Sequence, residues 1–315
     1  MLLHMLTADP VSLHAYQQGE GPRLDPRTGE LIFVDIAGHA VHRSRLSGGT
    51  LVPVGTYDLG EPVGTVAPLA APGAGWLVAV TDDVVHLAED GTRTLLHTGL
   101  AADHGQLNDG ACDPAGRFHC GSQSRLRRPV ARLHRLDTDG SLHVALTGVT
   151  VSNGIGFTAD GATMYYIDTL PARSLESFDV NPDGSLGRRR TVTAVSGGNP
   201  DGLAVDDEGC VWVAVWDGWA VHRYAPDGRL LAEVRLPVAR PTAVAFAGST
   251  LLVTTAYHGL DAAQRAAQPD AGRIFAVDAG VGGPAAYPWR GQPPLRQGTT
   301  AAVAVAAGGT DEPTR

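Results

Sequence analysis

Six positions that recur along the sequence carry a side-chain oxygen and could bind a metal ion. Two are carboxylates, two are amides and two are hydroxyls, spaced at intervals of roughly 41 to 48 residues. The six are Glu20, Thr65, Asn108, Asn153, Asp201 and Thr242. Carboxylate and amide oxygens that face one narrow space would repel or stay underpaired without a cation, whereas a hard divalent ion supplies charge and ligands. The pattern therefore predicts a divalent metal site.

The kinds of side chain narrow the choice of metal. The absence of His and Cys from these positions disfavours a structural zinc site and favours Ca²⁺, Mg²⁺, Mn²⁺ or Fe²⁺, with water completing the coordination. A zinc ion stays among the candidates, because oxygen ligands serve several metals. Asn, Asp and Thr also cap turns locally, which would explain any one position but not the set, since Glu20 is not a habitual turn former.

A sequence repeat positions these side chains. Turn residues followed by a short strand recur about six times, and each candidate stands about five residues before one copy. The copies are Asp25–Asp35, Ala70–Val80, Asp113–Ser122, Thr158–Asp168, Asp206–Val215 and Ala247–Ala256. A second strand with alternating apolar and polar residues follows each copy, and most of these strands lead into a hairpin signal such as Asp139-Gly140.

The period of the repeat predicts an all-β fold: a six-bladed β-propeller with four-stranded blades and a central metal site. A pair of β-sandwiches is the alternative, although sandwiches do not normally repeat one turn at a fixed period. We expect a single domain over residues 1–315, with an ordered core at about 8–298. The tail at 299–315 is either flexible or closes a blade through Ala301–Ala306, and Leu260–Gln268 is the only convincing helix.

Composition excludes several classes of protein. The chain contains no lysine, so neither a Schiff-base lysine nor a P-loop is possible. A net charge of −9 argues against a nucleic-acid partner. No apolar stretch is long enough to span a bilayer, and the amino end lacks the features of a signal peptide, so we expect a cytoplasmic protein without a membrane partner. Three cysteines without a C-x-x-C pair support neither a disulfide framework nor a zinc knuckle.

Four motifs in order resemble the senescence-marker-protein/gluconolactonase family, which includes the regucalcin-like proteins. They are Gly19–Pro22, Leu107–Gly110, Val151–Gly154 with Tyr166–Asp168, and Pro200–Leu203 followed by Val211–Ala214. The resemblance runs from about Gly19 to Val277. It implies a six-bladed propeller with one catalytic divalent metal held by Glu20, Asn153 and Asp201, and a substrate contact from Asn108.

The same resemblance implies a lactonase, a hydrolase that opens a sugar lactone. We expect the protein to be a monomer or a weak homodimer. Asp201 is the candidate catalytic base, and metal-bound hydroxide is the alternative. A non-catalytic Ca²⁺-binding regulatory protein and a phosphotriesterase or aryl-ester hydrolase remain open on the same ligands.

Further residues are candidates for substrate binding. Gln106 stands where some family members have an arginine, and Asp109 directly follows Asn108. Gln123, Trp216 and Tyr257 lie beyond second strands, and an antiparallel partner returns the chain to the end where the inner strand began. We therefore expect these three side chains to line the mouth of the pocket.

Overall fold

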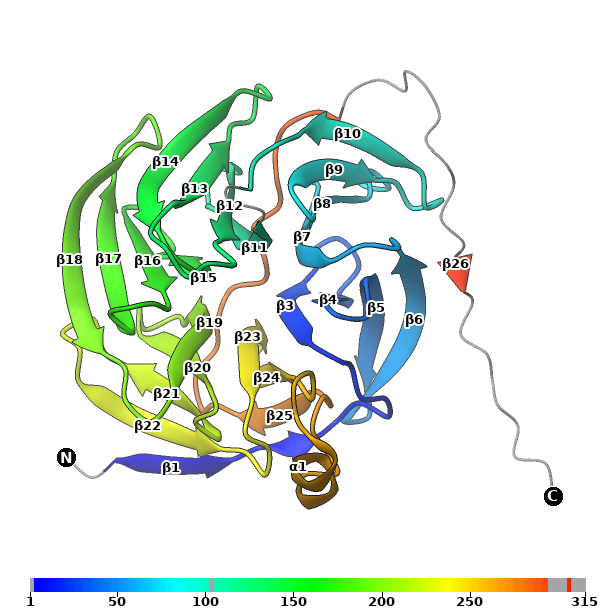
Figure 1. Cartoon of the computed structure of the whole chain (residues 1–315), viewed down its shortest axis with the longest axis vertical. Coiled ribbons are helices and arrows are strands. Elements are labelled where there is room, and N and C mark those ends of the chain that lie inside the picture. The colour runs from blue at the N-terminus through cyan, green and yellow to red at the C-terminus, as the bar shows by residue number, and fades with distance from the viewer. Residues whose placement is uncertain (1–2, 102–104, 294–304, 307–315) are drawn as a thin grey trace.

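The chain forms six β-sheets arranged in a ring around a central axis (Figure 1). The computed structural model describes residues 3–101 and 105–293, together with the backbone of 305–306. Every sheet is built on four antiparallel strands, and two of the sheets gain a fifth strand at the outer edge. The predicted all-β, six-bladed propeller with four-stranded blades is therefore confirmed.

Each blade runs from an inner strand at the axis to an outer strand at the rim. Blade one contains β3 (Gly19–Leu24), β4 (Leu31–Asp35), β5 (Ala40–Ser47) and β6 (Thr50–Asp58); blade two contains β7 (Val63–Pro68), β8 (Trp76–Val80), β9 (Asp83–Leu87) and β10 (Arg93–His97). Blade three contains β11 (Gln106–Cys112), β12 (Phe118–Gln123), β13 (Ala131–Leu136) and β14 (Leu142–Val149). Blade four contains β15 (Ser152–Phe157), β16 (Thr163–Asp168), β17 (Ser174–Val180) and β18 (Leu186–Ala194). Blade five contains β19 (Asn199–Val205), β20 (Val211–Trp216), β21 (Ala220–Tyr224) and β22 (Leu230–Arg235), and blade six contains β23 (Pro241–Ala247), β24 (Thr250–Thr255), β25 (Phe275–Asp278) and β2 (Asp9–Pro10).

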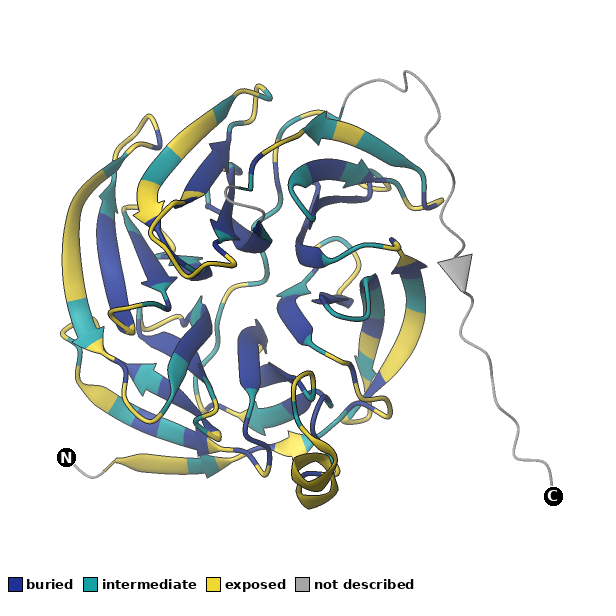
Figure 2. Cartoon of the chain, viewed as in Figure 1, coloured by how far each residue is buried: buried dark blue, intermediate teal, exposed yellow. Residues whose placement is uncertain are grey.

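The hydrophobic core is divided among the interfaces between blades. The second strands β4 and β8 are buried along their whole length, whereas outer strands such as β18 carry many exposed residues (Figure 2). A strand that is covered on both faces reads as a continuous apolar run, as in Leu31–Val34 and Trp76–Val80. Each interface has its own cluster; for example, Phe33 of blade one packs with Leu252 of blade six. Stacking around the ring thus buries faces that no single blade could cover.

The amino end of the chain closes the ring. Strand β2 pairs antiparallel with β25, so the outer strand of blade six comes from the opposite end of the chain from its three partners. Strand β1 (His4–Thr7) runs parallel to β22 and extends blade five. Ser12, just beyond β2, is buried, and its hydroxyl accepts a hydrogen bond from the Ile274 amide.

The described part of the C-terminal segment lies at the rim of the ring. Strand β26 (Val305–Ala306) pairs with β6 at the outer edge of blade one, while β2 supplies the outer strand of blade six. Residues 301–304, the start of the predicted strand, and residues 307–315 lie outside the described part of the chain.

The expected helix is confirmed and is shorter than the predicted Leu260–Gln268. Helix α1 (Ala262–Ala267) lies between β24 and β25, and Asp261 and Gln264 form a capping box at its first turn. No helix in the described residues has the length and apolar character needed to cross a membrane.

Candidate metal and active site

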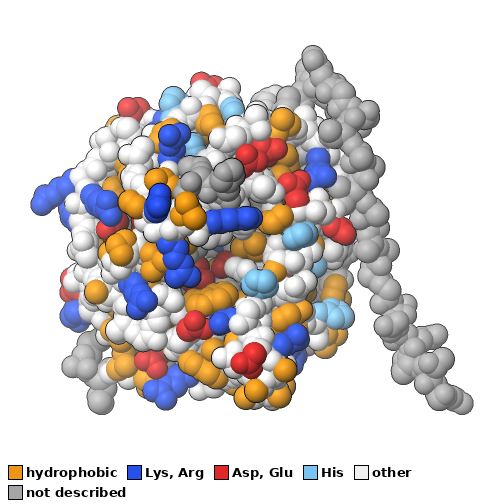
Figure 3. All heavy atoms as spheres, viewed as in Figure 1, with side chains coloured by type: hydrophobic (Ala, Val, Ile, Leu, Met, Phe, Trp, Pro, Cys, Tyr) orange, Lys and Arg blue, Asp and Glu red, His pale blue; other side chains and the backbone are white. Residues whose placement is uncertain are grey.

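A cavity of about 360 Å³ opens at one end of the central channel. Of the six predicted positions, Glu20, Asn108, Asn153 and Asp201 line it, and we refer to these four residues as the floor. They come from the inner strands of blades one, three, four and five, so residues up to 181 positions apart (201 − 20) share one space. Figure 3 shows acidic side chains in the hollow at the centre of this face and arginine side chains around it.

The floor residues project into the channel because the inner strands are irregular there. In each inner strand the pairing with the second strand shifts register close to the predicted position. The shifts fall between Glu20 and Arg23, Val63 and Thr65, Leu107 and Gly110, Ser152 and Ile155, Pro200 and Leu203, and Pro241 and Ala243. A β-bulge of this kind redirects side chains out of the regular alternation of a strand. The same irregularity thus brings four polar residues from four blades to one axis.

Thr65 and Thr242 do not line the cavity, contrary to the expectation that all six positions converge. The hydroxyl of Thr65 donates to the Gly110 carbonyl, and that of Thr242 donates to the Gly19 carbonyl. In blade two the bulged residue is Gly64. The alignment of the repeats selected Thr65, which is one position after this residue. Both threonines tie neighbouring inner strands together.

Two glycines allow the inner strands to approach closely beside the floor. A Cβ atom on Gly154 would lie 2.7 Å from the carbonyl oxygen of Asp201, and one on Gly202 would lie 2.4 Å from the Cβ of Ala243. Real Cβ atoms do not tolerate such contacts. Glycine after Asn153 and after Asp201 therefore permits blades four, five and six to meet at the axis.

Glu20 and Asp201 form a buried pair of carboxyl groups. Their residues are 5% and 7% exposed, and the two side chains are hydrogen-bonded to each other. Burial and the nearby charge of Asp109 raise the pKa of Glu20 to about 8. Burial and the charge of Glu20 raise the pKa of Asp201 well above its usual range. In the absence of a cation, the pair therefore keeps its protons to higher pH than isolated carboxyl groups do.

The two floor amides are held in fixed orientations. The Asn108 Nδ2 donates to the Asn153 Oδ1 at 2.7 Å and to the Ser152 carbonyl at 2.8 Å. The Asn153 Nδ2 donates to the Thr169 hydroxyl at 2.6 Å, and that hydroxyl donates to the Pro200 carbonyl at 2.8 Å. Because Thr169 takes the Nδ2, the Oδ1 of Asn153 is directed toward the channel, and its second lone pair stays available to a cation.

We expect Thr169→Val to weaken divalent metal binding about tenfold, because partners of metal ligands typically control affinity to that extent. Valine keeps the shape of threonine but cannot accept the Asn153 Nδ2 hydrogen bond, so the amide is free to rotate. Isothermal titration of the metal-free protein with Ca²⁺ or Mn²⁺ measures the change. Thr169→Ser keeps the hydroxyl and should retain wild-type affinity; equal affinity in the valine and serine variants would contradict this role.

The donor set of the floor suits a divalent cation held by oxygen. Glu20, Asp201 and the Asn153 amide oxygen supply two charged ligands and one neutral ligand, and Asn108 lies beside them. Within the described residues, no three His, Cys, Asp or Glu side chains gather into a metal site, so an amide oxygen has to complete the set. Hard cations such as Ca²⁺ and Mg²⁺ accept carboxylates, amide carbonyls and water together.

Asp109 lies below the floor and does not line the cavity, although it was expected to contact substrate. Its carboxylate accepts from the Arg23 guanidinium at 3.3 Å and from the Gly110 amide at 2.7 Å. Burial raises the pKa of Asp109 in spite of this pairing. The negative charge of Asp109 therefore acts on Glu20 from below.

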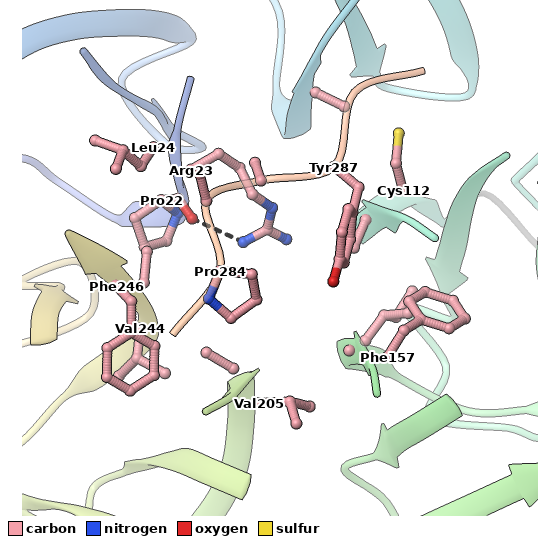
Figure 4. A pocket seen from close by; sticks show the side chains of 18 of the residues that line it. Pro22, Arg23, Leu24, Cys112, Phe157, Val205, Val244, Phe246, Pro284 and Tyr287 are labelled. Carbon is pink, nitrogen blue, oxygen red and sulfur yellow. Dashed lines mark hydrogen bonds between the residues drawn. The ribbon is translucent and has the colours of Figure 1, made fainter. Parts of the chain in front are cut away.

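The other end of the channel is apolar. A second cavity of about 80 Å³ lies there, lined by later residues of the same inner strands, including Val205, and by Pro284 and Tyr287 of the segment after β25 (Figure 4). The Arg23 guanidinium reaches into this region and donates to the Pro22 carbonyl. The inner strands thus run from a polar end to an apolar end.

The remaining predicted substrate residues divide into two groups. Gln123 and Trp216 line the cavity, and Gln123 donates to the Asn108 Oδ1 at 3.4 Å. Gln106 pairs with Gln123 through the backbone and is not among the lining residues. Tyr257 is also absent from the lining, because its ring packs under the Arg265 guanidinium at 3.9 Å.

Sequence analysis missed several residues that line the cavity. They are Gln18, Ser124, Arg125, Arg127, Thr169, Leu170, Arg173 and Asn199, with Val151 and Pro200 known only as motif residues. Most lie in the turns that follow second strands, where the sequences of the blades differ in length and composition. For Thr169, the one signal in the sequence was its position directly after the motif residue Asp168.

The part of the chain that contains the floor matches a known family. A family model described as the SMP-30/Gluconolactonase/LRE-like region matches residues 18–257. The chain belongs to this family. The matched residues include all four floor residues, as the resemblance in the motifs predicted.

Relatives in the SMP-30/gluconolactonase family cover nearly the whole chain. A 6-deoxy-6-sulfogluconolactonase of Pseudomonas putida is 36% identical over 84% of this chain and 92% of its own length. A regucalcin of Danio rerio is 35% identical over 87% of this chain and 95% of its own length. An L-arabinolactonase of Azospirillum brasilense is 33% identical over 87% of this chain and 93% of its own length. The crystal structure of a calcium-binding regucalcin from Agrobacterium tumefaciens superimposes with a TM-score of 0.81 at 26% identity, covering 92% of this chain and all of that one.

Proposed function

We propose that this protein is a lactonase that opens a sugar lactone to the sugar acid with the help of one divalent metal ion. The observation that carries the proposal is the floor: two buried carboxyl groups and two oriented amides at the open end of the channel. Relatives of this family named as sulfogluconolactonase and L-arabinolactonase support a sugar lactone as the substrate. Glu20, Asn153 and Asp201 would hold the metal.

Opening of the lactone requires a water molecule to attack the carbonyl carbon of the ring ester. A bound divalent cation would polarise that carbonyl and lower the pKa of water. Asp201, ionised as a ligand of the cation, would take a proton from the attacking water, and the bond between the carbonyl carbon and the ring oxygen breaks. The ring oxygen receives this proton from Asp201 and leaves as a hydroxyl group, and the product is a carboxylic acid. Asn108 lies beside the proposed ligands, and its Nδ2 would donate a hydrogen bond to a substrate oxygen in place of one of its present acceptors.

Gln123 and Trp216 orient the sugar. Gln123 lies within hydrogen-bond reach of Asn108, so it positions that amide and contacts sugar hydroxyls from the side of blade three. The Trp216 ring carries the Arg240 guanidinium on one face at 4.8 Å, which fixes the ring as one wall of the cavity. An aromatic wall suits the apolar face of a sugar ring.

A calcium-binding regulatory protein without catalysis is the second candidate. The relatives named regucalcin and the solved structure described as calcium-binding support this alternative, because the same oxygen ligands serve binding alone. A phosphotriesterase or aryl-ester hydrolase would use the same ligands. Substrate turnover separates these candidates.

The test is a panel of sugar lactones assayed by acid release with protein to which Ca²⁺, Mg²⁺, Mn²⁺, Zn²⁺ or Fe²⁺ has been added. The proposal expects at least one gluconolactone, arabinonolactone or xylonolactone to open far faster than in buffer with the same metal. An aryl ester and a phosphotriester serve as comparison substrates. Metal binding without lactone opening would support the regulatory protein, and turnover of the comparison substrates alone would support the other hydrolases.

A further inference from the structure

Three arginines, Arg125, Arg127 and Arg173, line the cavity above the floor, and we refer to them as the rim. Arg125 and Arg127 come from the turn between β12 and β13, and Arg173 comes from the turn between β16 and β17. All three are exposed. The rim therefore places positive charge on the blade three and blade four side of the opening.

Among the residues that the structure describes, the rim arginines differ from most other arginines in having no carboxylate partner. Fourteen others each lie within 4.0 Å of an Asp or Glu oxygen. In the described residues, none of the three rim guanidinium groups has such an ion pair. In a chain of net charge −9, three unneutralised arginines around one cavity are positioned to attract an anion.

The rim arginines lie in turns that join the second and third strands of their blades. The turn after the second strand contains a non-glycine residue with positive φ in each of five blades. These residues are His39, Thr81, Arg127, Arg173, and the pair Asp217 and Trp219. Because the conformation recurs, it is not confined to one blade. Arg127 lies four residues before β13 and Arg173 lies directly before β17, so the two arginines reach the cavity from different positions in their turns.

The floor and the rim favour different chemical groups of a ligand. The floor consists of two buried carboxyl groups and two amides, which suit the metal-assisted opening of an ester and offer no cationic side chain to an anionic group. The guanidinium groups above them bind sulfonate, phosphate or carboxylate oxygens in bidentate fashion. One ligand can bind to the floor and the rim together only if its ester lies at the floor and its negatively charged group lies at its other end.

We propose that the preferred substrate is a sugar lactone whose end remote from the ring ester carries a strongly acidic group, a sulfonate or a phosphate, bound by Arg125, Arg127 and Arg173. This inference rests on the proposed lactonase function. Because the rim is exposed, its contribution is screened by salt and acts mainly through substrate binding. The preference should therefore appear in KM more than in kcat.

The test compares gluconolactone with two derivatives that carry a sulfonate or a phosphate on the terminal carbon. We expect the wild type to prefer an acidic lactone by about tenfold or more in kcat/KM at low salt, and the two derivatives show which acid is favoured. A triple Arg125→Gln, Arg127→Gln, Arg173→Gln variant should lower kcat/KM for that lactone about thirtyfold and for gluconolactone less than about twofold. Arg128→Gln, an exposed arginine of the same turn that does not line the cavity, is the matched control.

A binding measurement keeps the inference separate from the lactonase proposal. Calorimetry with the open-chain sulfonated sugar acid and with gluconate reports on the rim without turnover. Equal kcat/KM for acidic and neutral lactones in the wild type would overturn the inference and leave the lactonase in place. If no lactone is opened, the proposed function fails, and calorimetry alone tests the anion site. Binding of the sulfonated acid that is lost in the triple variant would support binding by the rim arginines. No binding, or binding unchanged in the triple variant, would overturn the inference.

Discussion

Asp201→Asn is expected to lower kcat/KM for lactone opening by at least about a thousandfold while leaving the propeller folded, because it removes one metal ligand and the proton acceptor together. Asparagine has the same shape and its amide cannot accept a proton from water. The fold should tolerate the change, since the buried carboxyl group already favours its neutral form. Steady-state kinetics of acid release, with circular dichroism and thermal unfolding, measure both expectations.

Asp227→Asn is the matched control for this prediction. Asp227 belongs to the same blade, is exposed and pairs with Arg229 outside the cavity. Its replacement should change kcat/KM by less than about twofold. Wild-type turnover by the Asp201→Asn variant would remove Asp201 from the reaction.

Glu20→Gln is expected to weaken divalent metal binding by more than about a hundredfold, because it deletes one of two charged ligands. In metal-free protein the same change should stabilise the fold at alkaline pH. The folded-state pKa of Glu20 is raised to about 8, so its contribution to stability is fully present below its ordinary pKa and is lost as pH rises through about 8. A glutamine side chain does not ionise, so the variant does not lose this stability as pH rises.

Thermal unfolding in EDTA at about pH 5 and about pH 9 measures the second effect as the difference in Tm between wild type and variant. The difference isolates Glu20 from the buried His42 and His134, whose lowered pKa values give the opposite trend because they charge in acid. Added Ca²⁺ should raise the Tm of the wild type at about pH 9 and leave the variant unchanged. A Tm difference that does not depend on pH would contradict the buried charge of Glu20.

The number of blades and the floor could be predicted from sequence because both depend on repetition. The turn and strand motif recurs at a steady period, and a closed ring brings equivalent positions together. Asn108, Asn153 and Asp201 were therefore expected near Glu20, and the cavity contains all four. The family resemblance added expected roles to these positions, and those roles await experiment.

Features that break the repeat could not be predicted from sequence. The bulge in blade two falls on Gly64, and a one-residue displacement was enough to assign Thr65 to the channel. Closure of blade six by β2 depends on a pairing between residues at opposite ends of the chain, and two residues carry no strand signal. The rim arginines lie in turns of unequal length, where period alone does not show which side chains face the axis.

The central claim is that one divalent metal on Glu20, Asn153 and Asp201 opens a sugar lactone. The most direct test strips the wild type with EDTA and follows lactone opening during titration with one metal, while calorimetry records binding in parallel. We predict that activity is absent in the stripped protein, rises in proportion to occupancy and saturates at one metal ion per chain. Full activity in the stripped protein, or metal binding of equal affinity in the Glu20→Gln and Asp201→Asn variants, would contradict the claim.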